Sequence, residues 1–490
     1  MSRKLALAAA LLALATAFGC TEPAKREAPI DPGFPADASG DPPPAPREFR
    51  AAWVATVSNI DWPSRRDLTV AQQRAEMVAI LERARQLNLN ALILQVRPSA
   101  DAIYPSALEP WSEYLTGEQG RAPQPAWDPL QEWIDEAHRR GIELHAWFNP
   151  YRARYSRPLS PAARNHVSVT RPELVRSYGG FLWMDPGDAR VQDWSLRVIR
   201  DVVRRYDIDG VHIDDYFYPY RVRDPRRGGA LAFPDDATWR RYRRGGGKLA
   251  RDDWRRDNVN RFVRRLHLAV KAEKPKVKFG ISPFGIWRPG SPPGITGLDA
   301  YDELYADARL WLRNGWVDYW TPQLYWHPDA RGQRYDLLLD WWADQNVKDR
   351  HLWPGLFTSR AAGLDAANQW SPSAVTRQID ITRDEPRASG HVHFSMRALM
   401  SNVNALADTL LMSYAEPALV PATPWLDRTP PAKPVATLRK DATGGWTVQA
   451  TAGGRERPWR WVVRIETDSA WRTLLLPGYG DDRALEVAIP

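Results

Sequence analysis

The feature that most constrains this chain is a regular alternation of short apolar runs with helical patterns, which begins near residue 48. Several runs are apolar throughout, as expected for strands buried on both faces of a parallel sheet. Strands that alternate with helices indicate such a sheet. The predicted strands are Arg50–Val57, Asn90–Val96, Ile142–Phe148, Asp209–Asp215, Val277–Pro283, Val317–Gln323, His351–Phe357 and His391–Met396.

Amphipathic segments separate these runs. In the segment Asp128–Arg140, Asp128 is a candidate N-cap, Pro129 suits the first turn and Gly141 ends the pattern. The other predicted helices are Gln72–Leu87, Val191–Tyr206, Asp253–Ala272, Ala300–Arg313 and Arg334–Asn346.

Eight strand–helix units predict an α/β fold of the (β/α)8 TIM-barrel type over residues 48–416. The alternative is an open doubly wound sheet, which is disfavoured because no glycine-rich phosphate loop follows the first strand. Residues 417–434 are proline-rich and predict a linker. Residues 435–490 predict a small β-sandwich, fibronectin-like module, from the alternating runs Trp446–Ala450, Trp459–Thr467, Trp471–Leu476 and Leu485–Ile489.

The first residues are typical of an export signal. Arg3 and Lys4 precede an apolar run, and Gly19 and Cys20 follow it, so residues 1–19 are interpreted as a lipoprotein signal peptide. Ala17-Phe18-Gly19-Cys20 resembles a lipobox, and Cys20 is the expected lipidation site; plain secretion is the alternative. Residues 20–47 predict a disordered Pro-rich tether. Thr21 favours the outer membrane if the cell is Gram-negative.

Composition narrows the function classes. The single cysteine excludes a disulfide framework and a cysteine-ligated zinc cluster. The net charge of +8 favours anionic neighbours. No nucleic-acid-binding motif is present, and the export signal argues against such a partner. The 24 Trp and 17 Tyr residues supply flat apolar faces of the kind that bind sugar rings.

The fourth predicted strand ends in DGVHIDDYFYP, and active sites of such barrels lie at the carboxyl ends of the strands. Because side chains alternate along a strand, His212, Asp214 and Tyr216 would share one face and Asp215 the other. Two adjacent carboxylates are costly to bury without a task. We therefore expect a catalytic carboxylate here, with Asp214 favoured; a helix cap or a structural ion pair is the alternative.

The other strand ends carry aromatic, amide, arginine and carboxylate side chains. Sugars require this mixture, because their rings stack on aromatic faces and their hydroxyl groups pair with planar polar groups. This pattern predicts a carbohydrate site, and packing within the loops is the alternative for each residue. The predicted lining residues are Asp61, Trp62, Arg97, His145, Asn149, Tyr151, Arg152, His212, Tyr216, Tyr218, Trp287, Gln323, Tyr325 and Trp326.

No metal or other cofactor is expected. His145 and His212 lie on neighbouring predicted strands, but no HxxxH or His/Asp ligand set at useful spacing accompanies them. We interpret both histidines as residues of the barrel interior or as substrate contacts.

Six ordered motifs resemble the bacterial glycosyl-hydrolase-like family ten over about residues 48–415: FRAAWVATVSNIDWPS, LILQVRPSADAIYPS, WDPLQEWIDEAHRRGIELHAWFNPYR, YDIDGVHIDDYFYP, FGISPFGIWR and YWTPQLYW. The resemblance implies a (β/α)8 glycosidase and, frequently, an envelope lipoprotein. One branch is similar to glycosidases that cleave peptidoglycan glycan strands stripped of their peptides. That branch implies hydrolysis of the sugar backbone of a polysaccharide substrate. The lipobox-like residues separately predict a membrane link through a lipid at Cys20.

The Asp-Gly-x-x-x-Asp pattern also resembles the alpha-amylase and chitinase clans. By the amylase pattern, the nucleophile would be Asp214, although His212 stands where that pattern has Arg. The chitinase pattern has a Glu where this chain has Tyr216, and no Glu follows the fifth strand. The second carboxylate is therefore open. Asp101 is the first candidate for the acid, followed by Asp61, Asp215 and Asp185.

The sequence thus predicts a glycosidase in which Asp214 is nucleophile or base. A glycan-binding lipoprotein without catalysis and a hydrolase of another, anionic polysaccharide remain as alternatives.

Overall fold

The computed structural model describes residues 42–224, 228–363, 369–440, 445–466, 471–478 and 484–489. In this part of the chain the main element is a parallel sheet with the order β10–β9–β8–β7–β3–β2–β1–β12–β11. Its strands are β1 (Phe49–Val54), β2 (Ala91–Arg97), β3 (Glu143–Phe148), β7 (Gly210–Ile213), β8 (Lys278–Ile281), β9 (Tyr319–Trp320), β10 (His351–Leu352), β11 (Gly355–Leu356) and β12 (Gly390–His393).

The two edges of this sheet are consecutive pieces of one segment. β10 pairs with β9, and β11 pairs with β12. Trp353 joins the two pieces and its amide donates to the Trp320 carbonyl at 2.8 Å, while the Val392 amide donates to the Pro354 carbonyl at 3.0 Å. The sheet therefore returns on itself, and the predicted α/β barrel is confirmed.

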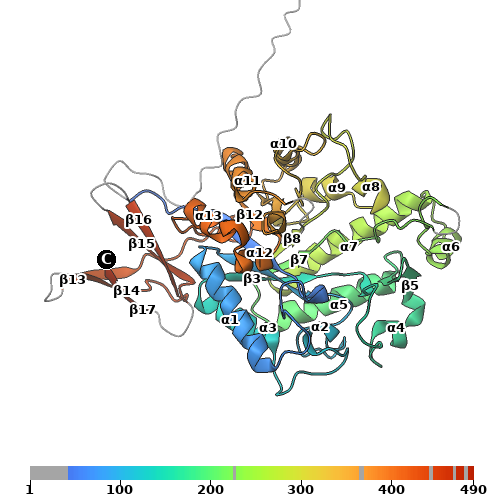
Figure 1. Cartoon of the computed structure of the whole chain (residues 1–490), viewed down its shortest axis with the longest axis horizontal. Helices are drawn as coiled ribbons and strands as arrows, with labels where there is room; N and C mark the ends of the chain where they lie inside the picture. Colours follow the sequence, from blue (N-terminus) through green and yellow to red (C-terminus); the bar gives the residue numbers. More distant parts are fainter. Residues whose placement is uncertain are drawn as a thin grey trace, which may run out of the picture.

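Helices surround the strands (Figure 1). The helices that follow successive strands are α1 (Val70–Gln86), α3 (Pro129–Arg139), α5 (Ala189–Arg205), α7 (Arg251–Glu273), α8 (Ala300–Glu303), α9 (Ala308–Arg313), α10 (Tyr335–Gln345), α11 (Pro372–Asp384), α12 (Met396–Ser401) and α13 (Leu406–Ser413). Their starts follow from local chemistry, because Asp128 caps α3 through the Gln131 amide and Thr69 forms a capping box at α1. The predicted helix 300–313 is two helices, α8 and α9.

Three loops at the carboxyl ends of the strands carry elements that the sequence pattern did not predict. The loop between β3 and α5 holds a small antiparallel sheet of β4 (Arg152–Arg154), β5 (Val175–Tyr178) and β6 (Phe181–Met184), and also α4 (Val167–Thr170). The loop after β7 holds α6 (Asp236–Arg244), and α2 (Glu113–Thr116) follows β2.

The barrel interior is aromatic. Phe49 stacks on Trp353 with ring centroids 3.6 Å apart, and Trp53, Trp147 and Tyr319 belong to the same buried cluster. Glycine makes room for this filling. A Cβ on Gly280 would lie 2.0 Å from the Tyr319 ring, which excludes any side chain there.

The C-terminal β module is confirmed as two small antiparallel sheets. One consists of β13 (Val435–Lys440), β14 (Trp446–Thr451) and β17 (Ala484–Ile489), and the other of β15 (Arg460–Glu466) and β16 (Trp471–Pro477). The module contacts the barrel where α3 ends, since the rings of Trp459 and His138 lie 4.6 Å apart. That is the amino end of the strands, opposite the predicted site.

Within the described residues, no helix is both long and apolar enough to cross a membrane. The predicted signal peptide, Cys20 and most of the predicted tether lie outside the described residues.

Candidate active site

Two adjacent carboxylates, Asp214 and Asp215, lie at the mouth of the barrel just beyond β7. Both are buried, with 5% and 4% of their surface exposed. The sequence pattern placed them on opposite faces of a strand. The pairing of β7 ends at Ile213, so the alternation of side chains stops before them. As a result both side chains reach the mouth, one on the side of β3 and the other on the side of β9.

Asp214 faces β3 and its hydrogen bonds are long. Its Oδ2 accepts from the indole N–H of Trp147 at 3.1 Å, and Asn149 Nδ2 lies 3.4 and 3.5 Å from the two carboxylate oxygens. Burial raises the pKa of Asp214 to about 7, and the charge of Asp215 adds to this rise. Near neutral pH, Asp214 can therefore hold a proton.

Asp215 faces the β9 side and has stronger donors. It accepts hydrogen bonds from the Tyr220 hydroxyl and the Gln323 side-chain amide. Burial raises the pKa of Asp215, but these two donors and Arg152 oppose the rise. Burial and the charge of Asp215 also raise the pKa of Tyr220, so its hydroxyl keeps the proton that it donates.

The two carboxyl groups titrate as a pair. A buried pair of like charges is costly, so one proton remains on the pair over a range around neutrality. The donors stabilise the ionised form of Asp215 more than that of Asp214. The arrangement thus provides one protonated and one ionised carboxyl group at the same mouth, which is the combination that hydrolysis of a glycosidic bond requires.

A buried arginine borders the pair. The guanidinium of Arg152 lies 4.3 Å from the centroid of the Tyr216 ring, and its charge lowers the pKa of both aspartates against the effect of burial. Burial raises the pKa of Tyr216 to about 12. The Nε atom of Arg152 has no hydrogen-bond partner among the described residues, so this buried donor is available to a substrate.

Beneath the carboxylates, a chain of hydrogen bonds runs through the barrel interior. The indole of Trp53 can only donate, so His212 Nε2 is the acceptor at 3.2 Å and the ring proton lies on Nδ1. His212 Nδ1 then donates to the Tyr319 hydroxyl at 3.1 Å, which donates to His145 Nδ1 at 2.9 Å. His145 Nε2 in turn faces Glu143 at 3.1 Å.

This chain accounts for both histidines that the sequence singled out. Burial lowers the pKa of His212 well below its usual range, so the ring is neutral. Gly210 is required beside His145, because a Cβ there would lie 2.6 Å from the imidazole. In the part of the chain that the structure describes, no three His, Cys, Asp or Glu residues form a group that could hold a metal ion.

The other candidate acids are each held by their own donors. Asp101 accepts from the Ser99 amide at 3.0 Å and from Gln119 Nε2 at 3.1 Å, and burial raises its pKa to about 6. Asp61 accepts from the Ser395 hydroxyl at 2.6 Å and from the amides of Arg397 and Ala55, and burial raises its pKa to about 6.

Asp185 pairs with Arg176 at 3.0 Å and accepts from the Thr238 hydroxyl at 2.8 Å. Within the described residues, Asp61, Asp101 and Asp185 form their hydrogen bonds and ion pairs with groups other than Asp214. Of the candidate acids, Asp215 is the one that lies beside Asp214. The predicted first choice for the acid, Asp101, does not share its environment.

Several predicted sugar contacts are packed away from the carboxylate pair. Trp62 is fully buried with its ring 5.3 Å from that of Trp133. Arg97 is also fully buried, and its Nε bonds Glu109 at 2.8 Å. The residues that the structure places in such interior packing are Trp62, Arg97, His145, Tyr151 and Tyr218.

Of the remaining predicted residues, those at or beside the carboxylate pair are Asn149, Arg152, Tyr216, Gln323 and Tyr325. Gln323 reaches Asp215, and the pKa of Tyr325 is raised by burial and by the charge of Asp215. Trp326 lies edge-on to Phe284 with centroids 5.6 Å apart, farther along the same loop. Trp287 stacks on Trp341 at 5.8 Å, outside this set.

Sequence reasoning missed three residues of this site: Trp53, Trp147 and Tyr220. Trp53 and Trp147 lie inside strands, where their apolar character indicated core packing. Tyr220 follows Pro219 in the run DDYFYPY and returns to Asp215. The alternation of aromatic residues after the two aspartates was the available signal, but the turn that brings Tyr220 back was not predictable from it.

A closed α/β barrel with two buried carboxylates, tyrosines and an arginine at the carboxyl ends of its strands defines a carbohydrate-cleaving hydrolase. Comparison with known families agrees. The model of the family Glycosyl hydrolase-like 10 matches residues 48–371, and the chain belongs to this family.

Two relatives show the extent of the similarity. The chain is 43% identical to Glycosyl hydrolase YngK of Bacillus subtilis (strain 168) over 84% of its own length and 80% of the relative. It is 37% identical to Glycosyl hydrolase DigH of Escherichia coli (strain K12) over 73% of its own length and 86% of the relative. By this homology the chain is a glycosyl hydrolase.

Proposed function

We propose that this glycosyl hydrolase cleaves the glycan backbone of peptidoglycan, in strands from which the peptides have been removed. The observation that carries the catalytic part is the Asp214–Asp215 pair, which combines a proton donor with an ionised carboxylate. The substrate class rests on the motif resemblance and on the expected export signal, since export brings the protein to the compartment that contains this polymer.

In the proposed reaction, Asp214 gives its proton to the glycosidic oxygen as the bond to the anomeric carbon breaks. Asp215 stays ionised and either attacks that carbon or removes a proton from the attacking water. This assignment exchanges the roles expected from the sequence, where Asp214 was nucleophile or base. The reason is that Asp215 accepts from the Tyr220 hydroxyl and the Gln323 amide, whereas the hydrogen bonds of Asp214 are long and burial raises its pKa to about 7.

Arg152 and the aromatic side chains would hold the sugars. The free Nε of Arg152 can donate to a hydroxyl or acetamido oxygen, and the exposed parts of Tyr216 and Tyr325 offer flat faces. No cofactor enters this scheme.

The test uses the chain without residues 1–20, incubated with peptide-free glycan and, separately, with intact sacculi. Mass spectrometry of the soluble fraction identifies the products. We expect oligosaccharides from the peptide-free glycan and none with Asp214→Asn. The matched control is Asp380→Asn, which makes the same change at an exposed position on α11. Binding without products would instead indicate a non-catalytic glycan-binding protein. Products from another, anionic polysaccharide alone would show that peptide-free glycan is not the substrate.

We further propose that Cys20 carries a lipid that attaches the protein to the envelope, with the outer membrane as the expected site. The support is the basic start, the short apolar run and the lipobox-like Ala17-Phe18-Gly19-Cys20. Metabolic labelling with a radioactive fatty acid tests this proposal. Label should enter the wild-type protein and be absent from Cys20→Ala; equal labelling would refute it.

A further inference from the structure

A groove of about 880 Å³ lies on the same end of the barrel as the carboxylate pair. Three loops form it, and each follows a barrel strand: residues 58–67 after β1, Tyr114 after β2 and residues 155–159 after β3. The first loop is held in place because Asn59 Nδ2 donates to the carbonyls of Pro63 and Tyr114, both at 2.8 Å. We call this feature the arginine groove, after its lining residues Arg65, Arg66 and Arg157.

The arginine groove adjoins the catalytic mouth. Tyr155 lines the groove and lies 5.9 Å from the guanidinium of Arg152. The same guanidinium lies 4.3 Å from the Tyr216 ring, and the Tyr216 amide donates to Asp214 at 3.5 Å. A chain of rings and one guanidinium thus leads from the groove to the proposed proton donor, so a glycan seated at Asp214 can extend into the groove.

The charges in the arginine groove are mostly uncompensated. Its one acidic lining residue, Asp67, lies 3.4 Å from Arg65, but both side chains are about two-thirds exposed, so this pair is weak. In the described chain, the side chains of Arg66 and Arg157 form no hydrogen bond or ion pair. Guanidinium groups in an open groove bind carboxylates well, because their planar N–H donors match the two oxygens.

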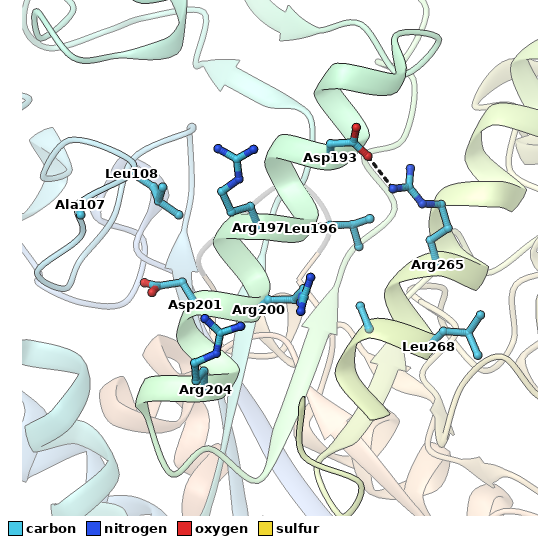
Figure 2. Close-up of a pocket in the computed structure, with 11 residues that line it drawn as sticks. Ala107, Leu108, Asp193, Leu196, Arg197, Arg200, Asp201, Arg204, Arg265 and Leu268 are labelled. Atoms are coloured by element: carbon cyan, nitrogen blue, oxygen red, sulfur yellow. Dashed lines mark hydrogen bonds and ion pairs between the residues drawn. The ribbon is translucent and has the colours of Figure 1, made fainter. Parts of the chain in front are cut away.

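A second depression offers a contrast. It lies on the outside of the barrel between α5 and α7 and is also rich in arginine (Figure 2). Three of its four arginines are paired there: Arg265 with Asp193 at 2.5 Å, and Arg200 and Arg204 with Glu273. Those ion pairs join the two helices and offset most of the charge, and the depression lies on the outer face of the barrel. Within the described chain, the groove beside the site has two arginines without an ion pair, Arg66 and Arg157, whereas the outer depression has one, Arg197.

We propose that the arginine groove binds the free carboxylate that a muramyl sugar carries on its lactyl group. This inference rests on the proposed function and gives it a basis for substrate selection. In a peptide-free strand every disaccharide presents one such carboxylate. In intact peptidoglycan the same group is consumed in the amide bond to the peptide, which removes the charge and adds bulk.

The test compares two substrates that differ only in this charge: peptide-free glycan, and the same glycan with its carboxyl groups chemically reduced to alcohols. The variants are Arg66→Gln, Arg157→Gln and the double variant. The matched control is Arg264→Gln, an exposed arginine on α7. Initial rates on both substrates give kcat and KM at low and high salt.

We expect the wild type to prefer the carboxylated glycan about tenfold in kcat/KM. Each single variant should raise KM for that glycan about two- to fivefold with kcat unchanged, because exposed ion pairs contribute little individually and act on binding alone. The double variant should lose the preference, and Arg264→Gln should keep it. High salt should weaken the preference in the wild type and in Arg264→Gln, and should have no effect on the double variant, which has no preference to lose.

Equal rates of the wild type on both glycans would overturn the inference, as would a double variant that keeps the preference. Failure of the proposed function has a different signature, since neither glycan would then be cleaved. In that case, co-sedimentation of the wild type and the double variant with both glycans tests whether the groove binds the carboxylate. Weaker binding of the double variant to the carboxylated glycan alone would support the groove, and equal binding would refute it.

Discussion

The hydrogen bond from Tyr220 to Asp215 provides the sharpest test of the proton assignment. Tyr220→Phe removes the hydroxyl and keeps the ring, which lies 5.6 Å from the Tyr216 ring. The ionised form of Asp215 then loses a donor, while the Gln323 amide and Arg152 remain. The pKa of Asp215 should therefore rise.

The size of the rise follows from the strength of the bond. A hydrogen bond to a charged group contributes about 1.5–3 kcal/mol, and a pKa unit corresponds to about 1.4 kcal/mol, so removal predicts a rise of about 1–2 units. Tyr220 is only half-buried, so water can replace part of the lost interaction. We therefore expect a rise near the lower end, about 1 unit.

The assay is the pH dependence of kcat/KM on peptide-free glycan. Asp215 must be ionised, so a higher pKa removes active enzyme from the acidic side, and the acidic limb should move up by about 1 unit. The alkaline limb reports loss of the Asp214 proton near pH 7 and should stay in place or move slightly upward. The profile becomes narrower and its maximum lower.

The matched control is Tyr178→Phe, which removes a hydroxyl that donates to the Leu231 carbonyl at 2.8 Å. Its profile should keep both limbs. A Tyr220→Phe enzyme with an unshifted acidic limb and a uniform loss of rate would refute the assignment of Asp215 as the ionised partner. A shift of the alkaline limb alone would indicate that Asp215 is the proton donor and Asp214 the ionised carboxylate.

Three further substitutions test the structure around the site. Asp101→Asn should keep kcat within about tenfold, and a 100-fold loss of kcat would contradict this expectation. It should also flatten the dependence of the free energy of unfolding on pH, which urea unfolding at several pH values measures. The reason is that the pKa of Asp101, raised to about 6 in the folded protein, gives stability that is present below pH 4 and lost as pH rises through 6. Tyr319→Phe should lower the free energy of unfolding by about 1–3 kcal/mol, because two imidazole nitrogens lose their shared hydroxyl; an unchanged urea midpoint would contradict the inferred chain. Trp62→Ala should cost about 3–5 kcal/mol of stability, while a raised KM with unchanged stability would place Trp62 at the substrate.

The barrel could be predicted because its strands are buried on both faces and therefore read as continuous apolar runs. The predicted run Val317–Gln323 contains β9, but only Tyr319–Trp320 pairs as a strand. The flanking residues Val317, Asp318 and Thr321 are also buried, although they lie outside the paired strand. Hydrophobicity reports burial, and it does not show where the backbone stops pairing.

The small sheet of β4, β5 and β6 was not predictable, because its strands are too short to form a recognisable apolar run. Its strands have three or four residues each, and β5 (Val175–Tyr178) is only partly buried. A segment this short shows no clear period of two. The sheet gains its stability from neighbouring loops, as where Met184 bonds the Tyr151 carbonyl, and such tertiary contacts leave no local sequence signal.

The structure places together the predicted site residues whose chemistry is costly to bury, and it places apart several residues that were predicted from their position alone. Asp214 and Asp215 stood out because adjacent carboxylates rarely occupy a strand end without a purpose. Asp101 and Trp62 also follow strands, but their loops turn the side chains into separate packing, against Gln119 and Trp133 respectively. Position at a strand end limits where a residue lies and leaves the direction of its side chain open.

The placement of the chain ends relative to the mouth links the fold to the proposed substrate. The chain enters β1 at the amino end of the strands, where Arg47 bridges to Leu419 of the segment that leads to the C-terminal module. Trp425 of this segment donates to Asp318, just before β9, at 2.9 Å. The entering chain and the module therefore occupy one end of the barrel, and the carboxylates and the arginine groove occupy the other. The proposed lipid at Cys20 would be joined to the chain that enters the barrel at the end opposite the mouth, so the point of chain entry does not obstruct a long polymer at the mouth.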